Sequence, residues 1–132
     1  MTTQKSSNLL VTMIDDEEVV HFIFQTIAKK IGVDTAVYGD AMTVLKLIEE
    51  NKFETDIILL DINMPFMNGW DFLDAFEPMN FDRPVVIVSS SRDRKDVEKS
   101  KQYKSVKGFY AKPLSFNNLS EIIDSTFKDR LN

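Results

Sequence analysis

Acidic, hydroxyl and basic side chains follow four of the five short apolar runs in this sequence, where each run ends. Asp15 and Asp16 follow the first run, and Asp61 follows the third. Ser89 follows the fourth run, and Lys112 follows the fifth. If the runs are parallel strands, their carboxyl ends meet at one edge of a sheet. Three carboxylates, a hydroxyl and an ammonium group then converge on one site.

The carboxylates indicate a metal ion and not a free phosphate. The loop from Asp15 to Glu18 holds four acids and no glycine, whereas a nucleotide-binding or flavin-binding loop presents glycines and backbone N–H groups to phosphate. Crowded carboxylates stay ionised at low cost only beside a cation. Oxygen ligands without cysteine or histidine suit Mg²⁺ or Mn²⁺. An alternative is that Asp16 to Glu18 only complement a helix dipole, but this leaves Asp61 unexplained.

The elements that must position these groups alternate between apolar runs and helical patterns. The runs cover residues 9–14, 35–38, 57–60, 85–88 and 109–111. The first, third and fourth are continuously apolar, which is typical of parallel strands covered on both faces. Apolar stripes at helical spacing lie between and after them: Val20, Ile23, Phe24, Ile27 and Ile31; Ala41, Val44, Leu45 and Ile48; Gly69, Phe72, Leu73 and Phe76; and Leu119, Ile122, Ile123 and Thr126.

Two of these helices carry recognisable N-caps, at Asp40 and Ser115. A fourth helix over residues 94–105 offers little apolar surface, so we expect it to be the least firmly packed. The alternation predicts an α/β fold of the flavodoxin-like (βα)5 type, in which helices cover both faces of a five-stranded parallel sheet.

Length and composition limit the function classes. The 132 residues predict a single domain over residues 1–132 with its core at about 9–127. A net charge of −5 argues against direct nucleic-acid binding. The chain has no cysteine, and no apolar stretch approaches the roughly 20 residues of a membrane span. We therefore expect a cytoplasmic protein that does not insert into membranes.

The motifs occur in a characteristic order: Asp15-Asp16, then Asp61-Ile62-Asn63-Met64-Pro65 with Gly69, then Ser89, then Lys112-Pro113. Together they resemble the receiver domain of two-component response regulators, the CheY-like type, over nearly the whole chain. The resemblance implies that Asp61 accepts a phosphoryl group from a histidine kinase or a histidine phosphotransfer protein. It also implies that Mg²⁺ is held by Asp15, Asp16, Asp61 and the backbone carbonyl of Asn63.

The same resemblance implies a conformational switch. Lys112 would pair with the phosphoryl oxygens and precede a cis peptide bond to Pro113. Ser89 would move to bond the phosphoryl group, and Phe109, three residues before the lysine, would rotate inward with it. The output surface would be the fourth helix, fifth strand and fifth helix, in a monomer or a phosphorylation-dependent dimer.

The resemblance predicts a phosphoacceptor domain and not an enzyme, with at most slow self-catalysed phosphorylation and dephosphorylation. Asn63 and Ser91 occupy the positions that tune dephosphorylation, and both are small enough to admit water. A magnesium-dependent phosphatase with an aspartyl nucleophile is the enzymatic alternative, but it needs a second carboxylate where this chain has Asn63. A pseudo-receiver that no longer takes phosphate is the other alternative, and the complete site set argues against it.

Several residues near the predicted site are predicted to have roles other than metal binding or phosphoryl transfer. Val19 and Phe22 lie off the apolar stripe of the first helix, near the acidic loop, and suggest a docking contact for a kinase or phosphotransfer helix. His21 is predicted to be a solvated surface residue. The apolar residues that follow the phosphoacceptor position are predicted to form a loop lid and packing contacts: Met64, Phe66, Met67 and Trp70.

Overall fold

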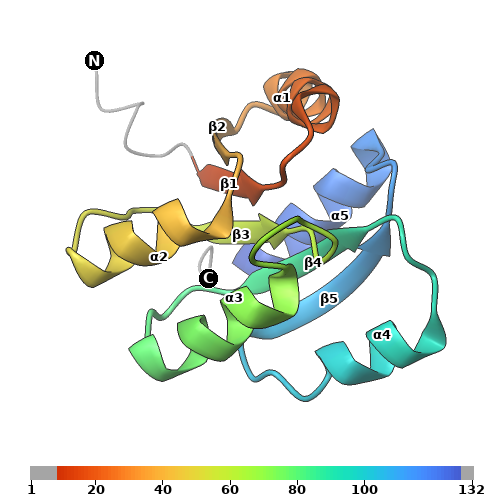
Figure 1. Cartoon of the computed structure of the whole chain (residues 1–132). Helices are drawn as coiled ribbons and strands as arrows, with labels where there is room; N and C mark the ends of the chain where they lie inside the picture. Colours follow the sequence, from red (N-terminus) through yellow and green to blue (C-terminus); the bar gives the residue numbers. More distant parts are fainter. Residues whose placement is uncertain (1–8, 129–132) are drawn as a thin grey trace.

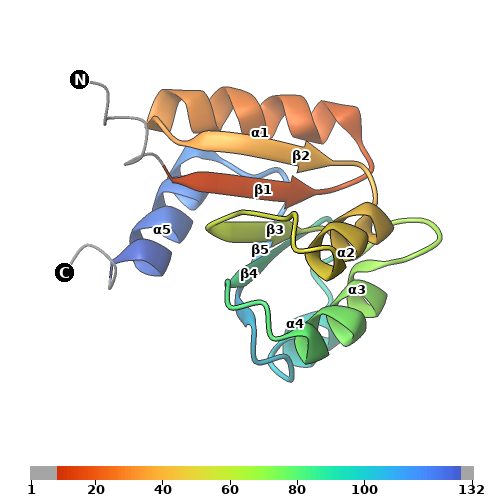
Figure 2. The same cartoon turned by 90° about the vertical axis from the view of Figure 1, so that its left-hand side faces the viewer.

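One parallel five-stranded sheet, in the order β2-β1-β3-β4-β5, forms the centre of the molecule. The computed structural model describes residues 9–128. Its strands are β1 (Leu10–Ile14), β2 (Asp34–Tyr38), β3 (Ile57–Leu60), β4 (Val85–Ser89) and β5 (Val106–Ala111). Its helices are α1 (Glu18–Ile31), α2 (Ala41–Glu49), α3 (Gly69–Phe76), α4 (Arg94–Ser100) and α5 (Phe116–Phe127), with a 3-10 turn η2 (Glu77–Met79) after α3. Helices α1 and α5 cover one face, and α2, α3 and α4 cover the other (Figures 1 and 2). The predicted α/β fold is confirmed.

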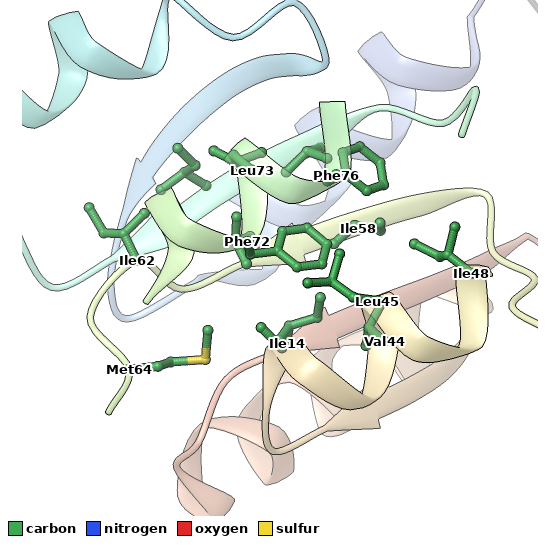
Figure 3. Packing of buried hydrophobic residues seen from close by; sticks show 14 of the residues in the cluster. Ile14, Val44, Leu45, Ile48, Ile58, Ile62, Met64, Phe72, Leu73 and Phe76 are labelled. Atoms are coloured by element: carbon green, nitrogen blue, oxygen red, sulfur yellow. The ribbon is translucent and has the colours of Figure 1, made fainter. Parts of the chain in front are cut away.

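Strand β3 is closed on both faces, as its continuous apolar run predicts. Ile58 and Leu60 join the hydrophobic cluster under α2 and α3, whereas Ile57 and Leu59 join the cluster under α1 and α5. Figure 3 shows part of the first cluster, where these side chains pack together: Ile14, Val44, Leu45, Ile48, Ile58, Ile62, Met64, Phe72, Leu73 and Phe76. Each fully buried side chain of this size contributes roughly 1.5–3 kcal/mol. The strand that directly precedes Asp61 is therefore firmly anchored.

The predicted helix starts at Asp40 and Ser115 are confirmed. The Asp40 carboxylate accepts a hydrogen bond from the Thr43 N–H at 2.8 Å, and the Ser115 hydroxyl accepts one from the Asn118 N–H at 3.0 Å. A further cap at Asn68 starts α3 through a capping box with Asp71. This cap places the start of α3 directly after the loop that follows β3.

Two helices differ from the prediction, α1 in the side chains that it buries and α4 in the residue at which it ends. In α1 the fully covered residues are Phe24 and Ala28, and Ile23 of the predicted stripe is 38% exposed. Helix α4 ends at Ser100, five residues earlier than predicted, because residues 101–105 form a turn into β5. Ser100 is the only buried residue of α4, which confirms its predicted weak packing. Among residues 9–128, no helix combines the length and apolarity of a transmembrane span.

Candidate functional site

The candidate site lies at the carboxyl ends of β1 and β3, where the strand order reverses and where ligands bind in sheets of this topology. Two backbone hydrogen bonds hold its acids to the sheet. The Asp61 N–H donates to the Ile14 carbonyl and the Asp15 N–H donates to the Tyr38 carbonyl, each at 3.0 Å. Asp61 is 3% exposed and Asp15 is 1% exposed. Both carboxylates therefore have fixed positions and little contact with water.

Three carboxylates from two loops form a possible metal centre. Asp15, Asp16 and Asp61 each offer one oxygen, and these oxygens lie within 4.8 Å of one another. Asp16 is exposed, so the cluster is open to solvent on one side. The donor set consists of hard oxygen ligands, which suits Mg²⁺ because magnesium keeps several waters and shares its shell with substrate phosphate. The residues present therefore fit the implied ion.

Lys112 links the acids from the opposite side of the site. Its Nζ lies 2.6 Å from Asp15 Oδ2, 3.4 Å from Asp61 Oδ2 and 3.5 Å from Glu17 Oε1. The backbone N–H of Lys112 donates to the Ser89 carbonyl at 2.8 Å, and the Lys112–Pro113 peptide is cis, as the resemblance implied. The contact with Glu17 was not predicted, because no local pattern relates two residues so far apart in the chain.

The surroundings raise the pKa values of both Asp61 and Lys112. Burial raises the pKa of Asp61, and the Asp15 charge adds to this, while the Asn63 N–H and Lys112 act in the opposite direction. Burial by itself lowers the pKa of Lys112, but the hydrogen bond and charge of Asp15, followed by the charges of Asp61 and Glu17, outweigh it and raise the pKa. The lysine therefore stays cationic, and a metal-free site holds more negative charge than one lysine can balance.

The Ser89 hydroxyl is fully buried and accepts two hydrogen bonds. One comes from the Asn63 side-chain amide at 3.3 Å, and the other comes from the Ser91 N–H at 3.1 Å. Asn63 also donates its backbone N–H to Asp61 Oδ1 at 3.1 Å. The Ser91 hydroxyl in turn donates to Asp96 Oδ2 at 2.6 Å, in the first turn of α4. Asp96 was missed by sequence reasoning, where it is one charge among many on a polar helix.

Phe109 and its neighbour Tyr110 lie on opposite faces of β5, as the pleat of a strand predicts. Phe109 packs against the cluster under α2 and α3, whereas Tyr110 packs against the other cluster and donates its hydroxyl to Glu121 of α5 at 3.1 Å. Both rings are half-buried. Phe109 therefore lies on an edge strand with its ring only partly covered.

The flanking predictions have mixed outcomes. Val19 and Phe22 are 62% and 69% exposed, which leaves them accessible to a partner. The prediction for His21 is wrong: its half-buried ring Nε2 lies 2.6 Å from the Asp15 carbonyl, because the first turn of α1 folds back over the acidic loop. Met64 is buried as predicted, but Phe66 points fully into solvent with a left-handed backbone at φ 66°. Phe66 is therefore not part of a packed lid.

Comparison with known proteins agrees with this geometry. The family model of the response regulator receiver domain matches residues 11–124. The chain is 29% identical over 112 residues to the two-component response regulator ARR10 of Arabidopsis thaliana, a match that covers 85% of this chain and 20% of that protein. The chain thus spans about a fifth of the length of the curated relatives it matches.

Solved structures give the same result. A two-component response regulator from Cytophaga hutchinsonii is similar with a TM-score of 0.75 and 29% identity, covering 92% of this chain and 98% of that one. The receiver domain of Francisella response regulator 1452 is similar with a TM-score of 0.79 and 26% identity, covering 93% and 99%. The chain therefore belongs to the response regulator receiver domain family.

Proposed function

We propose that this receiver domain is a phosphorylation switch in which Asp61 accepts a phosphoryl group from a histidine kinase or a histidine phosphotransfer protein. One observation carries the proposal. A buried carboxylate, anchored at the end of β3, lies 3.4 Å from the Lys112 ammonium and next to two further acids that fit a divalent cation. This arrangement suits phosphoryl transfer, where catalysis consists mainly of positioning and charge neutralisation.

In the proposed reaction an oxygen of Asp61 attacks phosphorus and forms an acyl phosphate. The bond from phosphorus to the donor histidine nitrogen breaks, and the nitrogen keeps the electron pair. Mg²⁺, held by Asp15, Asp16, Asp61 and the Asn63 carbonyl, would supply positive charge that offsets the phosphoryl oxygens. Lys112 would exchange part of its contact with the acids for a contact with the phosphoryl group.

The response would begin at Ser89 and reach the α4–β5–α5 surface. Ser89 would leave its present partners to donate to a phosphoryl oxygen, and Phe109 would turn inward with it. Because α4 buries only Ser100, it can shift at small energetic cost, which suits a pre-existing two-state equilibrium. We propose that the domain acts in the cytoplasm, as a monomer or a phosphorylation-dependent dimer, with at most slow self-catalysed turnover.

The test is incubation with Mg²⁺ and acetyl phosphate, followed by intact mass measurement, and in parallel beryllofluoride binding followed by Trp70 fluorescence. The expected result is an acid-labile, magnesium-dependent adduct in the wild-type protein that is absent in Asp61→Asn. No adduct and no response to beryllofluoride would reject the switch and favour a pseudo-receiver that binds partners without phosphate. Trp70 is the single tryptophan, so its signal is unambiguous.

Donor docking is proposed at α1, where Val19 and Phe22 are exposed. Beside them an apolar groove of about 270 Å³ lies between α1 and the β5–α5 loop, and Ile23 and Leu114 contribute to its lining. An amphipathic helix of a phosphotransfer partner could place an apolar side chain in it. Phe22→Ala should slow transfer from a phosphorylated histidine phosphotransfer protein and leave labelling by acetyl phosphate unchanged. An unchanged transfer rate would remove Phe22 from the docking surface.

A further inference from the structure

The segment from residue 92 to residue 107, which contains α4, carries charge opposite to the remainder of the chain. It holds seven of the 16 Lys and Arg residues but only three of the 21 Asp and Glu residues, so its net charge is +4. The remaining residues hold nine basic and 18 acidic side chains, for a net charge of −9. A protein that is acidic overall thus concentrates its positive charge on one helix and its flanks.

The positive side chains of this segment are exposed and mostly unpaired. All seven are exposed: Arg92, Arg94, Lys95, Lys99, Lys101, Lys104 and Lys107. Of these seven side chains, only Lys101 forms a salt bridge with a residue in the described range 9–128, namely with Glu98 at 3.1 Å. The other two acids of the segment are used locally. Asp93 caps α4 by accepting from the Lys95 N–H at 2.9 Å, and Asp96 accepts from the Ser91 hydroxyl.

This basic surface also contains a groove and lies beside two aromatic rings. Residues at helical spacing line an open groove of about 600 Å³ along α4: Asp93, Arg94, Lys95, Glu98, Lys99 and Gln102. Lys99 Nζ lies 4.8 Å from the centre of the Trp70 ring, which stacks on Tyr103 at 5.9 Å between centroids. Arginine, tryptophan and tyrosine are the residues that most often dominate binding energy at protein interfaces.

We propose that this basic α4 surface, defined by residues 92–107, docks an acidic segment of a partner protein. Charge complementarity decides between occupants. In a symmetric dimer through α4 the patch would face its own copy, and the +4 surfaces would repel each other. A head-to-tail contact with an acidic face of a second copy would lead to open chains unless the rotation between copies closes a ring. A hetero-partner with a local acidic segment avoids both problems.

The surface coincides with part of the output face of the proposed function, and only its link to phosphorylation rests on that proposal. Asp96 is joined through Ser91 to the buried Ser89 hydroxyl. A partner that prefers one position of α4 would therefore also favour one position of Ser89. By linkage, the factor by which the partner changes the equilibrium for phosphorylation equals the factor by which phosphorylation changes the affinity for the partner. The preference for acidic partners follows from the charges alone.

The test is a titration of the unphosphorylated protein with poly-L-glutamate at low ionic strength, monitored by Trp70 fluorescence. Binding that weakens as salt is added is expected, because exposed charges are screened. Arg94→Glu/Lys95→Glu should weaken the apparent affinity about tenfold, since two favourable contacts become unfavourable. These acids also favour the start of α4 through the helix dipole, so the fold should persist. Arg94→Gln/Lys95→Gln, with about a threefold loss, provides a milder second variant.

The matched control is Lys29→Glu/Lys30→Glu, in the last turn of α1, which lowers the net charge by the same amount. It should change the affinity less than about twofold. Equal weakening by the two charge-reversed variants, or no binding at low ionic strength, would overturn the proposal. Tighter binding of a single-stranded DNA oligonucleotide than of poly-L-glutamate would assign the surface to nucleic acid instead. If the protein binds beryllofluoride but not poly-L-glutamate, only this inference is rejected. If it binds poly-L-glutamate but not beryllofluoride, only the proposed function is rejected.

Discussion

Replacing Asp61 with asparagine should stabilise the metal-free protein at pH 7. In the wild-type site the carboxylates of Asp15 and Asp61 are 1% and 3% exposed and both lie against the one ammonium group of Lys112. Burial and the Asp15 charge raise the pKa of Asp61, which means that the folded state holds its ionised form less easily than the unfolded state does. Asparagine keeps the shape and an acceptor for the Asn63 N–H but removes the excess charge.

The magnitude follows from linkage between ionisation and folding. Each pKa unit by which folded Asp61 exceeds its ordinary value of 3.8 subtracts about 1.4 kcal/mol from the free energy of unfolding at pH 7. Asparagine makes a weaker bond to Lys112, which costs about 0.5–1 kcal/mol. The sign of the expected net effect is a gain, on the order of 1 kcal/mol as is typical of stabilising substitutions, or roughly 4 °C in Tm for a domain of this size.

The sign of the pH dependence provides a second check. Between 3.8 and the raised folded pKa, the folded state binds more protons than the unfolded state, so wild-type stability falls as pH rises through this window. The advantage of Asp61→Asn should therefore be full above the folded pKa and should shrink as pH falls towards 3.8. Urea denaturation in EDTA at pH 7 and at pH values through the window measures this difference.

Two comparisons make the result specific. Asp82→Asn, at an exposed aspartate in the loop before β4, should change stability by less than about 0.5 kcal/mol. Saturating Mg²⁺ should stabilise the wild-type protein more than Asp61→Asn, by about 2.7 kcal/mol at 100 times Kd in the wild type. If Asp61→Asn is less stable than the wild type in EDTA at pH 7, the account of a charge-crowded site is refuted.

Three further substitutions test local features of the fold by urea denaturation. Gly69→Ala should cost about 2–3 kcal/mol, because its Cβ would lie 2.6 Å from a backbone carbon of the loop after β3, whereas Gly39→Ala has nothing within 4 Å and should cost less than about 0.5 kcal/mol; equal effects would contradict the clash. Asp40→Ala should cost about 1 kcal/mol by removing the α2 cap, and an unchanged midpoint would show that the cap is not needed. Tyr103→Phe should cost about 0.5 kcal/mol by removing the 2.7 Å bond to Asp74, with a cost constant from pH 6 to about 9, because burial first and then Asp74 raise the pKa of Tyr103 to about 12; a cost that changes between these pH values would contradict a protonated hydroxyl.

The strands, and the set of residues that meet at the site, were predictable because both follow from local sequence patterns. A continuously apolar run of four residues such as residues 57–60 is typical of a strand that is buried on both faces, and the structure places it at the centre of the sheet. Once five short apolar runs alternate with helices, the residue after each run lies at one edge of the sheet. Proximity of Asp15, Asp61 and Lys112 followed from topology without any knowledge of side-chain contacts.

The missed contacts have a different origin. Glu17 shares Lys112 with two aspartates, His21 folds onto the Asp15 carbonyl, and Asp96 receives the Ser91 hydroxyl. Each depends on the rotamer of a polar side chain at the rim of the site, and polar side chains carry no periodic signal. The early end of α4 has a related cause, since residues 101–105 are polar enough for a helix surface or a turn. Their backbone conformation is decided by contacts with Glu77, which accepts bonds from both Lys104 and Ser105.

The hydrogen bonds around Ser89 suggest how a charge on Asp61 would reach α4. In the present conformation the Ser89 hydroxyl accepts from both Asn63 and Ser91. To donate to a phosphoryl oxygen, the hydroxyl would have to move, and this movement would strain the bonds that it accepts from Asn63 and Ser91. Loss of the bond from the Ser91 N–H would free Ser91, whose hydroxyl donates to Asp96 at 2.6 Å, and would loosen the first turn of α4.

The far end of α4 is held differently. The Trp70 ring on α3 stacks on Tyr103 and lies under Lys99, and the Tyr103 hydroxyl donates to Asp74 of α3. None of these contacts involves the loop of residues 61–68, so we expect them to persist when Ser89 changes position. A helix that is released at its first turn and retained at its last turn pivots and does not slide. The side chains that move furthest would then be those at the start of α4, where Arg94 and Lys95 lie on the basic surface.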